Sequence, residues 1–125
     1  MDLFEYATIR VVPRVERGEF INVGVVLFCK NQKFLRSRIA LDKVRLAALF
    51  PESDAGVIVQ HLQSFDNICT GEISKSPIAT LDAASRFRWL TARRSTIIQA
   101  SEVHPGLCLD AETTLMNLFE QVVAS

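Results

Sequence analysis

The sequence lacks the short motifs by which many enzymes are recognised. It has no P-loop or G-x-G-x-x-G phosphate-binding turn, and no G-x-S-x-G elbow for a serine nucleophile. Its two histidines, His61 and His104, and its three scattered cysteines show no recognisable metal-ligand spacing. We therefore expect neither a cofactor nor a metal, and an enzyme is not the favoured function.

Cysteine is scarce, and no two cysteines form a C-x-x-C pair. Cys29, Cys69 and Cys108 are odd in number and lie among apolar residues, which is typical of buried free thiols in a reducing cytosol. The N-terminal stretch MDLFEYA lacks the basic flank and apolar core of a secretory signal. Apolar runs stay far below the roughly 20 residues that cross a membrane. We expect a cytoplasmic protein that does not bind membranes.

No Lys or Arg follows Arg94, although the formal net charge of the 125-residue chain is zero. Residues 1–50 hold nine Lys or Arg and five Asp or Glu, a net of +4, whereas residues 51–125 hold five and nine, a net of −4. The zero total gives no global electrostatic reason to bind nucleic acid. The asymmetry predicts either a local basic face or a mixed solvated surface. The length predicts a single domain over residues 1–125.

Runs of β-branched and aromatic residues predict strands, and apolar residues at helical spacing predict helices. Asp42, Ser53 or Asp54, Thr80 and Asp110 stand where N-cap residues begin a helix. The expected fold class is α+β, an antiparallel sheet made of a three-strand meander plus a fourth strand, with helices packed on one face. The predicted strands are 3–12, 20–29, 34–40 and 95–101, the predicted helices are 43–50, one that ends before Gly71, 81–90 and one that follows Asp110, and the predicted loops include 72–77 and 102–106.

The second predicted strand carries Asn22 and Gly24 inside an otherwise apolar run. Its odd positions, 21 to 29, are all apolar and define a core face, so Asn22 and Gly24 belong to the opposite face. We expect the first hairpin to be symmetric about Glu16. This register pairs Arg10 with Asn22, Thr8 with Gly24, and Tyr6 with Val26.

The missing side chain of Gly24 would then leave a dent in the outer face of the sheet. Tyr6, Arg10 and Asn22 would form its walls, and a glycine within a strand often marks the close approach of a backbone or a ligand. The hypothesis is a polar recess that holds a ligand. The alternative interpretation is that Gly24 marks a bulge and that Asn22 faces solvent.

The register of the second hairpin decides where two further arginines point. A two-residue turn at Asn31-Gln32 would place Arg36 and Arg38 on the core-facing side, whereas a three-residue loop would place them beside Arg10. Because two charges are costly in a core, the longer loop is favoured. It predicts a basic strip that could hold phosphates or carboxylates, or a hydrated edge strand protected against aggregation.

The stretch RFRWLTARRST, residues 86–96, holds four arginines around Trp89 and no acidic residue. Arginine beside an aromatic side chain is typical of phosphate, nucleic-acid and protein contacts, and the hydroxyls that follow could complete an anion site. The alternative is that Phe87 and Trp89 are core residues and that the arginines are solvated. The candidate site residues of this stretch are Arg86, Arg88, Trp89, Arg94, Ser95 and Thr96.

His104 is the better of the two histidines for acid–base work, because it precedes Pro105-Gly106 in a predicted loop. His61 falls at the edge of the apolar face of a predicted helix and is interpreted as a surface residue. A Ser95–His104 pair is not favoured, since no nucleophile elbow surrounds the serine.

Three stretches, YATIRVVPRVERGEFINVGVVLFC, RFRWLTARRSTIIQ and VHPGL, together resemble the bacterial domain-of-unknown-function family numbered 3037 over residues 4–107. Arg93 departs from the pattern, in which proline is expected at this position, so Arg94 and Ser95 matter more than Arg93. The resemblance implies a small bacterial cytoplasmic protein without an established activity. It also implies a HipA-like kinase as a partner, or a toxin–antitoxin-like pair.

Three functions remain open. The favoured one is a non-enzymatic binding or accessory module that holds a partner protein or an anionic ligand. The first alternative is an enzyme acting on a phosphate-bearing substrate, with His104 as acid–base and the arginines as a clamp. The second is nucleic-acid binding by the arginine–tryptophan stretch, which the zero net charge disfavours. The outer sheet face could instead be a homodimer surface. The residues assigned to the site are Tyr6, Arg10, Arg17, Glu19, Asn22, Gly24, the six candidates of residues 86–96, and His104.

Overall fold

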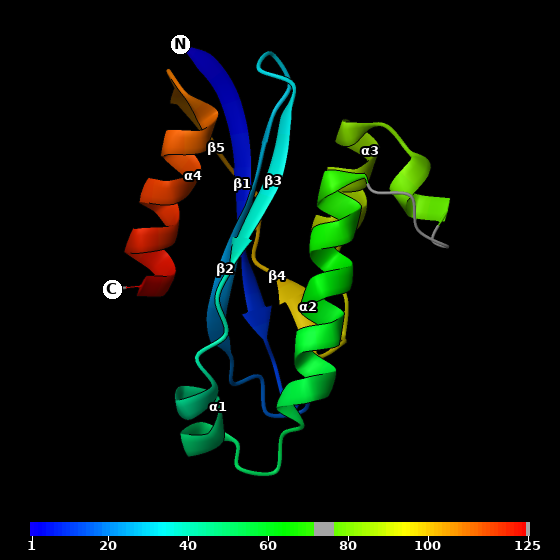
Figure 1. Cartoon of the computed structure of the whole chain (residues 1–125), viewed down its shortest axis with the longest axis vertical. Helices are drawn as coiled ribbons and strands as arrows, with labels where there is room; N and C mark the ends of the chain where they lie inside the picture. Colours follow the sequence, from blue (N-terminus) through cyan, green and yellow to red (C-terminus); the bar gives the residue numbers. More distant parts are fainter. Residues whose placement is uncertain (72–76, 125) are drawn as a thin grey trace.

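The computed structural model describes residues 1–71 and 77–124 and contains an antiparallel sheet flanked by helices (Figure 1). The predicted α+β class and the antiparallel sheet are confirmed. The strands are β1 (Asp2–Val11), β2 (Ile21–Cys29), β3 (Phe34–Ile39), β4 (Ile98–Ala100) and β5 (His104–Cys108), and the helices are α1 (Lys43–Leu49), α2 (Ala55–Thr70), the 3-10 helix η1 (Pro77–Thr80), α3 (Ala83–Thr91), α4 (Ala111–Phe119) and its π-helical continuation η2 (Glu120–Ala124).

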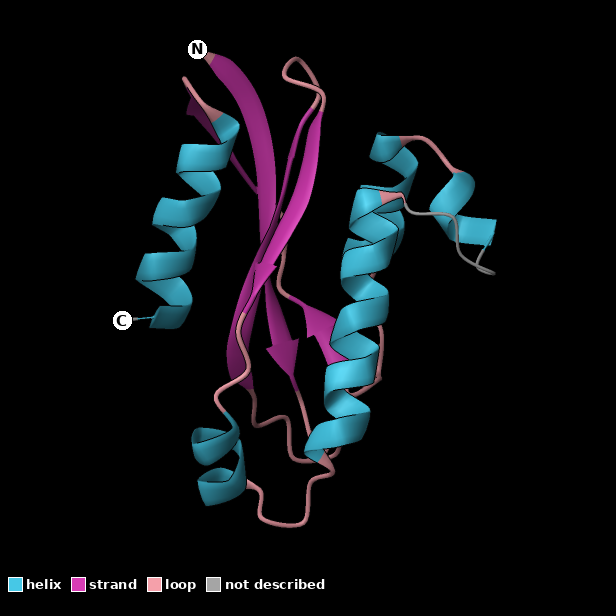
Figure 2. Ribbon diagram, viewed as in Figure 1, coloured by secondary structure: helices cyan, strands magenta, loops and turns pink. Residues whose placement is uncertain are grey.

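Strand β1 lies inside the sheet and is paired along both of its edges. One edge pairs with β2, which pairs in turn with β3. The other edge is shared by β5, opposite residues 2–6, and β4, opposite residues 9–11 (Figure 2). Between these two strands Ser101 is buried, and its hydroxyl accepts a hydrogen bond from the Thr8 amide at 2.8 Å. The buried backbone of β1 therefore keeps a partner where β4 and β5 break.

Strand β2 contains a β-bulge at Val23. Consecutive β1 residues Ile9 and Arg10 pair with Gly24 and Asn22, so Val23 is an extra residue on β2. The bulge changes which alternate residues face each side of the sheet. Ile21, Val23, Val26 and Phe28 join one hydrophobic cluster, whereas Val25, Leu27 and Cys29 join the other.

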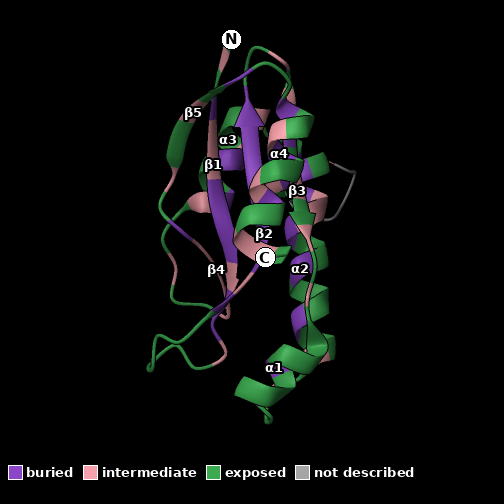
Figure 3. Cartoon of the chain, turned by 90° about the vertical axis from the view of Figure 1, so that its left-hand side faces the viewer, coloured by how far each residue is buried: buried purple, intermediate pink, exposed green. Residues whose placement is uncertain are grey.

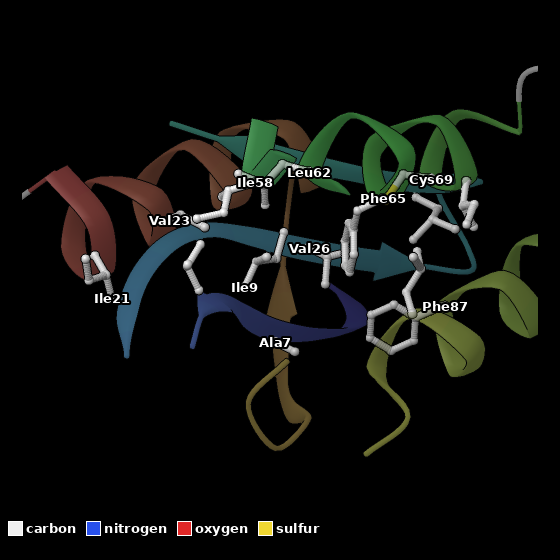
Figure 4. Packing of buried hydrophobic residues seen from close by; sticks show 14 of the residues in the cluster. Ala7, Ile9, Ile21, Val23, Val26, Ile58, Leu62, Phe65, Cys69 and Phe87 are labelled. Atoms are coloured by element: carbon white, nitrogen blue, oxygen red, sulfur yellow. The ribbon is translucent and has the colours of Figure 1, made fainter. Parts of the chain in front are cut away.

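Helices cover both faces of the sheet, so the prediction that they pack on one face is wrong. Helices α2 and α3 lie on one side and α4 on the other (Figure 1). Figure 4 shows Ile58, Leu62 and Phe65 of α2 packing toward Val23 and Val26. Because β2 is apolar on both faces, leaving either in water would forfeit about 25 cal/mol for each Å² of apolar surface. The second cover had to come from the C-terminal helix.

Aspartates begin all four α-helices. The side chains of Asp42, Asp54, Asp82 and Asp110 each accept a hydrogen bond from the backbone amide three residues further on. Thr80, the predicted cap of the third helix, instead donates its hydroxyl to the carbonyl of Pro77 and closes η1. Three of the four predicted N-caps are thus confirmed, and the N-cap of the third helix, Asp82, lies two residues after the predicted one. Helix α1 is mostly exposed at one end of the molecule (Figure 3).

The predicted loop 102–106 is wrong, because most of it belongs to β5. Gly106 pairs with Phe4, and a Cβ at Gly106 would collide with the Phe4 ring. The glycine therefore marks a place where an aromatic ring crosses the neighbouring strand. The predicted strand 95–101 is correspondingly shorter, at Ile98–Ala100. The predicted loop 72–77 falls outside the described residues except for Pro77, which opens η1.

The second hairpin has the register of the shorter turn, so the predicted three-residue loop is wrong. Cys29 pairs with Phe34, which places Arg36 opposite Leu27 and Arg38 opposite Val25. Both arginines remain exposed because β3 is an edge strand. The Arg38 guanidinium lies over the ring of Phe119 at 4.9 Å, so an edge position lets an apolar stem cover α4 while the charge stays in water.

Candidate functional site

The predicted recess above Gly24 does not form. Arg10 pairs with Asn22 as expected, but the bulge moves Thr8 opposite Val25 and Tyr6 opposite Leu27. A Cβ on Gly24 would lie 2.6 Å from the carbonyl oxygen of Arg38. The glycine is therefore required by the close approach of β3, and the space above it is filled by protein.

Tyr6 and His104 form a separate pair at the other end of β1. They are cross-strand partners, and their ring centroids are 5.4 Å apart. Tyr6 packs against the α4 cluster, whereas His104 is exposed on the edge strand β5. His104 lines none of the hollows described below, so the structure does not bring it together with the arginine segment.

Arg10 is held by the first hairpin, and part of its head group is without a hydrogen-bond partner. Its guanidinium carbon lies 4.1 Å from the centre of the Phe20 ring, a cation–π contact. Its Nε atom and the Oδ1 atom of Asn22 are both buried without hydrogen-bond partners in the described chain. A buried polar atom without a hydrogen-bond partner lowers the stability of the fold by about 1–3 kcal/mol. This end of β1 therefore has one donor and one acceptor that remain unsatisfied.

The open side of Arg10 lines a hollow of about 660 Å³, which we call the cationic hollow. One wall comes from the end of β1 and the turn before β2, and the other from the segment that follows α3. The side chains that define it are Arg10, Phe20, Arg93, Arg94, Ser95 and Glu102. Sequence positions more than 80 apart thus meet, and Arg10 of the first predicted cluster lies on the same hollow as Arg94 and Ser95 of the second.

A second hollow of about 530 Å³ lies between α2, the end of α3 and the segment leading into β4. We call it the apolar hollow, because most of its walls are hydrocarbon. The residues that define it are His61, Phe65, Ile68, Trp89, Leu90 and Ile98. Arg94, Gln99 and Ala100 line both hollows, so the two share a wall.

Trp89 and Arg94 form the ridge where the hollows meet. The Arg94 guanidinium lies 3.9 Å from the indole ring, and it donates a hydrogen bond to the Trp89 carbonyl. Trp89 keeps 38% of its surface exposed, so it is not the core residue of the alternative interpretation. Burial lowers the pKa of Arg94 from its ordinary value, because a cation that loses water without gaining a carboxylate is disfavoured.

Arg86 and Arg88, also predicted site residues, serve the fold instead. Arg86 donates to the Leu81 carbonyl at 2.9 Å and to the Cys69 carbonyl at 3.5 Å, which ties α3 to the end of α2. Arg88 makes two hydrogen bonds to the Glu5 carboxylate, at 3.0 and 2.9 Å. Those bonds raise the pKa of Arg88. Both guanidinium groups therefore have protein partners and do not line either hollow.

The remaining predicted residues are divided between the site and the surface. Arg17 and Glu19 form an ion pair with each other in the first turn. Arg17 also lines a separate hollow of about 460 Å³ beside α1 and the start of α2. Ser95 lines the cationic hollow and Thr96 the apolar one, where the Thr96 hydroxyl donates to the Ile98 carbonyl at 2.8 Å.

The family model described as Protein of unknown function (DUF3037) matches residues 6–123. The chain belongs to this family. Neither a curated protein nor a solved structure shows significant similarity to it. The resemblance drawn from the three sequence stretches is thereby confirmed.

In this DUF3037 protein, sequence reasoning missed or set aside four residues of the two hollows. Arg93 was discounted as a departure from the family pattern, His61 was interpreted as a surface residue, and Gln99 and Glu102 were not considered. Only the run of two arginines at 93–94 was a usable signal. The others were indistinguishable from ordinary helix, strand and loop residues, since their importance depends on the packing of α2 against β4.

The described residues contain neither a cluster of metal-ligating side chains nor a membrane-spanning helix. Within residues 1–71 and 77–124, no group of three or more His, Cys, Asp or Glu side chains gathers in a way that could hold a metal ion. No helix in the same residues of this DUF3037 protein is long and apolar enough to cross a membrane. Burial raises the pKa of the Cys69 thiol to about 12, so this cysteine stays protonated at neutral pH.

Proposed function

We propose that this DUF3037 protein is a binding module that holds an anionic group, a phosphate or a carboxylate, of a ligand or a partner protein in the cationic hollow. The single observation that carries the proposal is the convergence of Arg10 with Arg93, Arg94 and Ser95 on one hollow of about 660 Å³. Arginine suits this role because its planar, permanently charged head binds such groups through two parallel hydrogen bonds.

The charges of the hollow support an external anion. In the part of the chain that the structure describes, none of these three arginines forms a salt bridge, whereas Arg14, Arg17 and Arg88 each do. Glu102 also lines the hollow and reduces its charge. Three cations against one carboxylate still leave an excess of two positive charges, and the buried Nε of Arg10 has no partner. An entering oxyanion would neutralise this excess of positive charge.

The test is a titration with inorganic phosphate, with chloride as the comparison at equal ionic strength, followed by two-dimensional ¹H–¹⁵N NMR. We expect saturable shifts of the Arg10 Nε–H signal and of the amides of residues 93–95. Arg10→Gln should weaken phosphate binding by about ten-fold, the value of one charge-assisted hydrogen bond. Arg45→Gln, a matched loss of charge on the exposed helix α1, should have no effect.

Two results would overturn this function. One is phosphate shifts spread evenly over all exposed arginines, since that is ordinary screening of surface charge. The other is an affinity that Arg10→Gln and Arg45→Gln reduce equally.

The proposal also includes a partner protein and a cellular compartment. The anionic group can belong to a partner protein. In that case we propose that the partner is a HipA-like kinase, which the family resemblance implies. The setting is the reducing cytosol, supported by three cysteines that are free and buried. Co-purification of the kinase with the wild-type protein, and its loss with Arg10→Gln but not with Arg45→Gln, is the expected result. Equal recovery with both variants would remove the kinase from the proposal.

A further inference from the structure

The cationic and apolar hollows adjoin, and together they limit the class of ligand that can bind. Arg94, Gln99 and Ala100 line both of them, so a molecule seated in one can extend past this shared wall into the other. Each hollow, at about 660 and 530 Å³, lies within the range of roughly 300–1,000 Å³ that is usual for small-molecule sites. A ligand that fills both has a charged end and a less polar body.

The ridge between the hollows is formed by two planar groups, the Arg94 guanidinium and the Trp89 indole. The guanidinium of Arg94 stacks on the indole of Trp89 at 3.9 Å, and Trp89 also lines the apolar hollow. Guanidinium planes and exposed indoles are the surfaces on which nucleic-acid bases stack in proteins, at about 1–3 kcal/mol for each base. A planar ring is therefore better matched to this ridge than a flexible chain.

The apolar hollow also contains polar groups at its rim. His61 and Ser64 of α2 line it together with Gln99. The Gln99 amide nitrogen donates to the Thr96 carbonyl at 2.8 Å, and its amide oxygen accepts no hydrogen bond within the described residues. The Ser64 hydroxyl donates to the Gln60 carbonyl at 3.1 Å, but a fatty acyl body would bury the Gln99 amide oxygen without a partner, which costs free energy. A heterocyclic ring with hydrogen-bonding edges would satisfy them.

We propose that the two hollows together bind a nucleoside phosphate, with the base beside Trp89 and Gln99 and the phosphate beside Arg10, Arg93 and Ser95. This inference rests on the proposed anion-binding function and adds the class of the ligand. Recognition here uses side chains from β1, α2, α3 and the segment 91–100, and it needs no glycine-rich loop.

The experiment compares the monophosphates of adenosine, guanosine, cytidine and uridine with ribose 5-phosphate, which carries the phosphate and the sugar but no base. Trp89 is the only tryptophan of the chain, so its fluorescence reports directly on the ridge, and calorimetry gives the affinities. We expect at least one nucleotide to bind about ten-fold or more tightly than ribose 5-phosphate, with a change in Trp89 emission.

Variants separate the two ends of the site. Gln99→Ala should weaken nucleotide binding several-fold and leave ribose 5-phosphate binding unchanged, about the effect of one lost hydrogen bond. Gln60→Ala, at an exposed position of α2, is the matched control. Arg10→Gln should weaken both probes by the same factor. Circular dichroism and thermal melts confirm that each variant is folded.

The outcomes distinguish the two proposals. If ribose 5-phosphate binds and all four nucleotides bind no more tightly, the nucleotide inference fails while the anion-binding function stands. If neither ribose 5-phosphate nor any nucleotide binds, the anion-binding function fails with it. If nucleotides bind but Arg10→Gln has no effect on them, the joint site is overturned.

Discussion

The two halves of the segment 86–96 each contain two arginines, and the arginines of one half have a different role from those of the other. In the first half, Arg86 and Arg88 are paired with carbonyls and with Glu5. In the second half, Arg93 and Arg94 have no carboxylate partner among the described residues and line a hollow. The difference shows that an arginine-rich stretch is not a functional unit. What decides the role of each arginine is whether the fold supplies its counter-charge.

The largest expected effect is on the free energy of unfolding, and it comes from removing an arginine of the first half of the segment. Arg86→Ala should lower the free energy of unfolding by about 2 kcal/mol, because two carbonyls lose a charged donor and the tie between α3 and α2 is cut. Phosphate affinity should stay unchanged. Urea denaturation measures the first and calorimetry the second, with Arg45→Ala as the control. A loss of phosphate binding in a folded Arg86→Ala protein would contradict the comparison.

The second effect comes from the other half. Arg94→Gln should weaken phosphate binding by about five-fold, since one of three cations is removed from the cationic hollow. Its free energy of unfolding should fall by only about 1 kcal/mol, because the hydrogen bond to the Trp89 carbonyl and the contact with the indole are lost but no salt bridge is. Calorimetry and thermal melts measure the two quantities. A large destabilisation with normal binding would place Arg94 among the structural arginines.

A smaller effect concerns the exposed pair of Arg88 with Glu5. A double-mutant cycle with Arg88→Ala and Glu5→Ala should give a coupling free energy of about 0.5 kcal/mol, since the Arg88 side chain is 59% exposed. High salt should reduce it. Coupling near zero at low salt would mean that the two hydrogen bonds contribute geometry and no stability.

The smallest effect is a pH dependence at the start of α3. Hydrogen bonds from Ser85 lower the pKa of Asp82 from its ordinary 3.8. A carboxylate with a depressed folded-state pKa stabilises the protein above the unfolded value, and this contribution is lost as the pH falls through the folded value. Asp82→Asn should therefore show a flatter acid limb in thermal melts between pH 5 and 3 than the wild type. Identical limbs would show that the cap carries no charge-dependent stability.

Local features of the fold were predictable because their causes lie within a few residues. The side chains of Asp42, Asp54 and Asp110 each accept a hydrogen bond from the amide three positions further on. Such local geometry can be predicted from the sequence. Gly71 adopts a positive φ of 70° at the end of α2 as expected. The pairing of Arg10 with Asn22 was also correct, since the turn fixes the nearest pairs of a hairpin.

Features that depend on distant packing were not predictable. The bulge at Val23 shifts the β1–β2 register from Gly24 onward, and the neighbouring glycine indicated a bulge only as an alternative to the recess. The loop assigned to residues 102–106 became β5, because β1 offered an unpaired edge and Phe4 needed a glycine opposite it. The two hollows accordingly contain some of the predicted site residues, namely Arg10, Trp89, Arg94, Ser95 and Thr96, and not the others, namely Tyr6, Arg17, Glu19, Asn22, Gly24, Arg86, Arg88 and His104.

The sequence by itself determined the main helices, three of their four aspartate caps, the first three strands and the family. These follow from hydrogen bonds and apolar periodicity within short stretches. Only the tertiary structure decided which arginines lack a carboxylate partner among the described residues. Arg10 meets Arg93 and Arg94 because β4 pairs with the end of β1, whereas Arg88 meets Glu5 because α3 crosses the start of the same strand. Whether two distant charges pair depends on how the whole chain folds. The sequence of one segment does not contain that information.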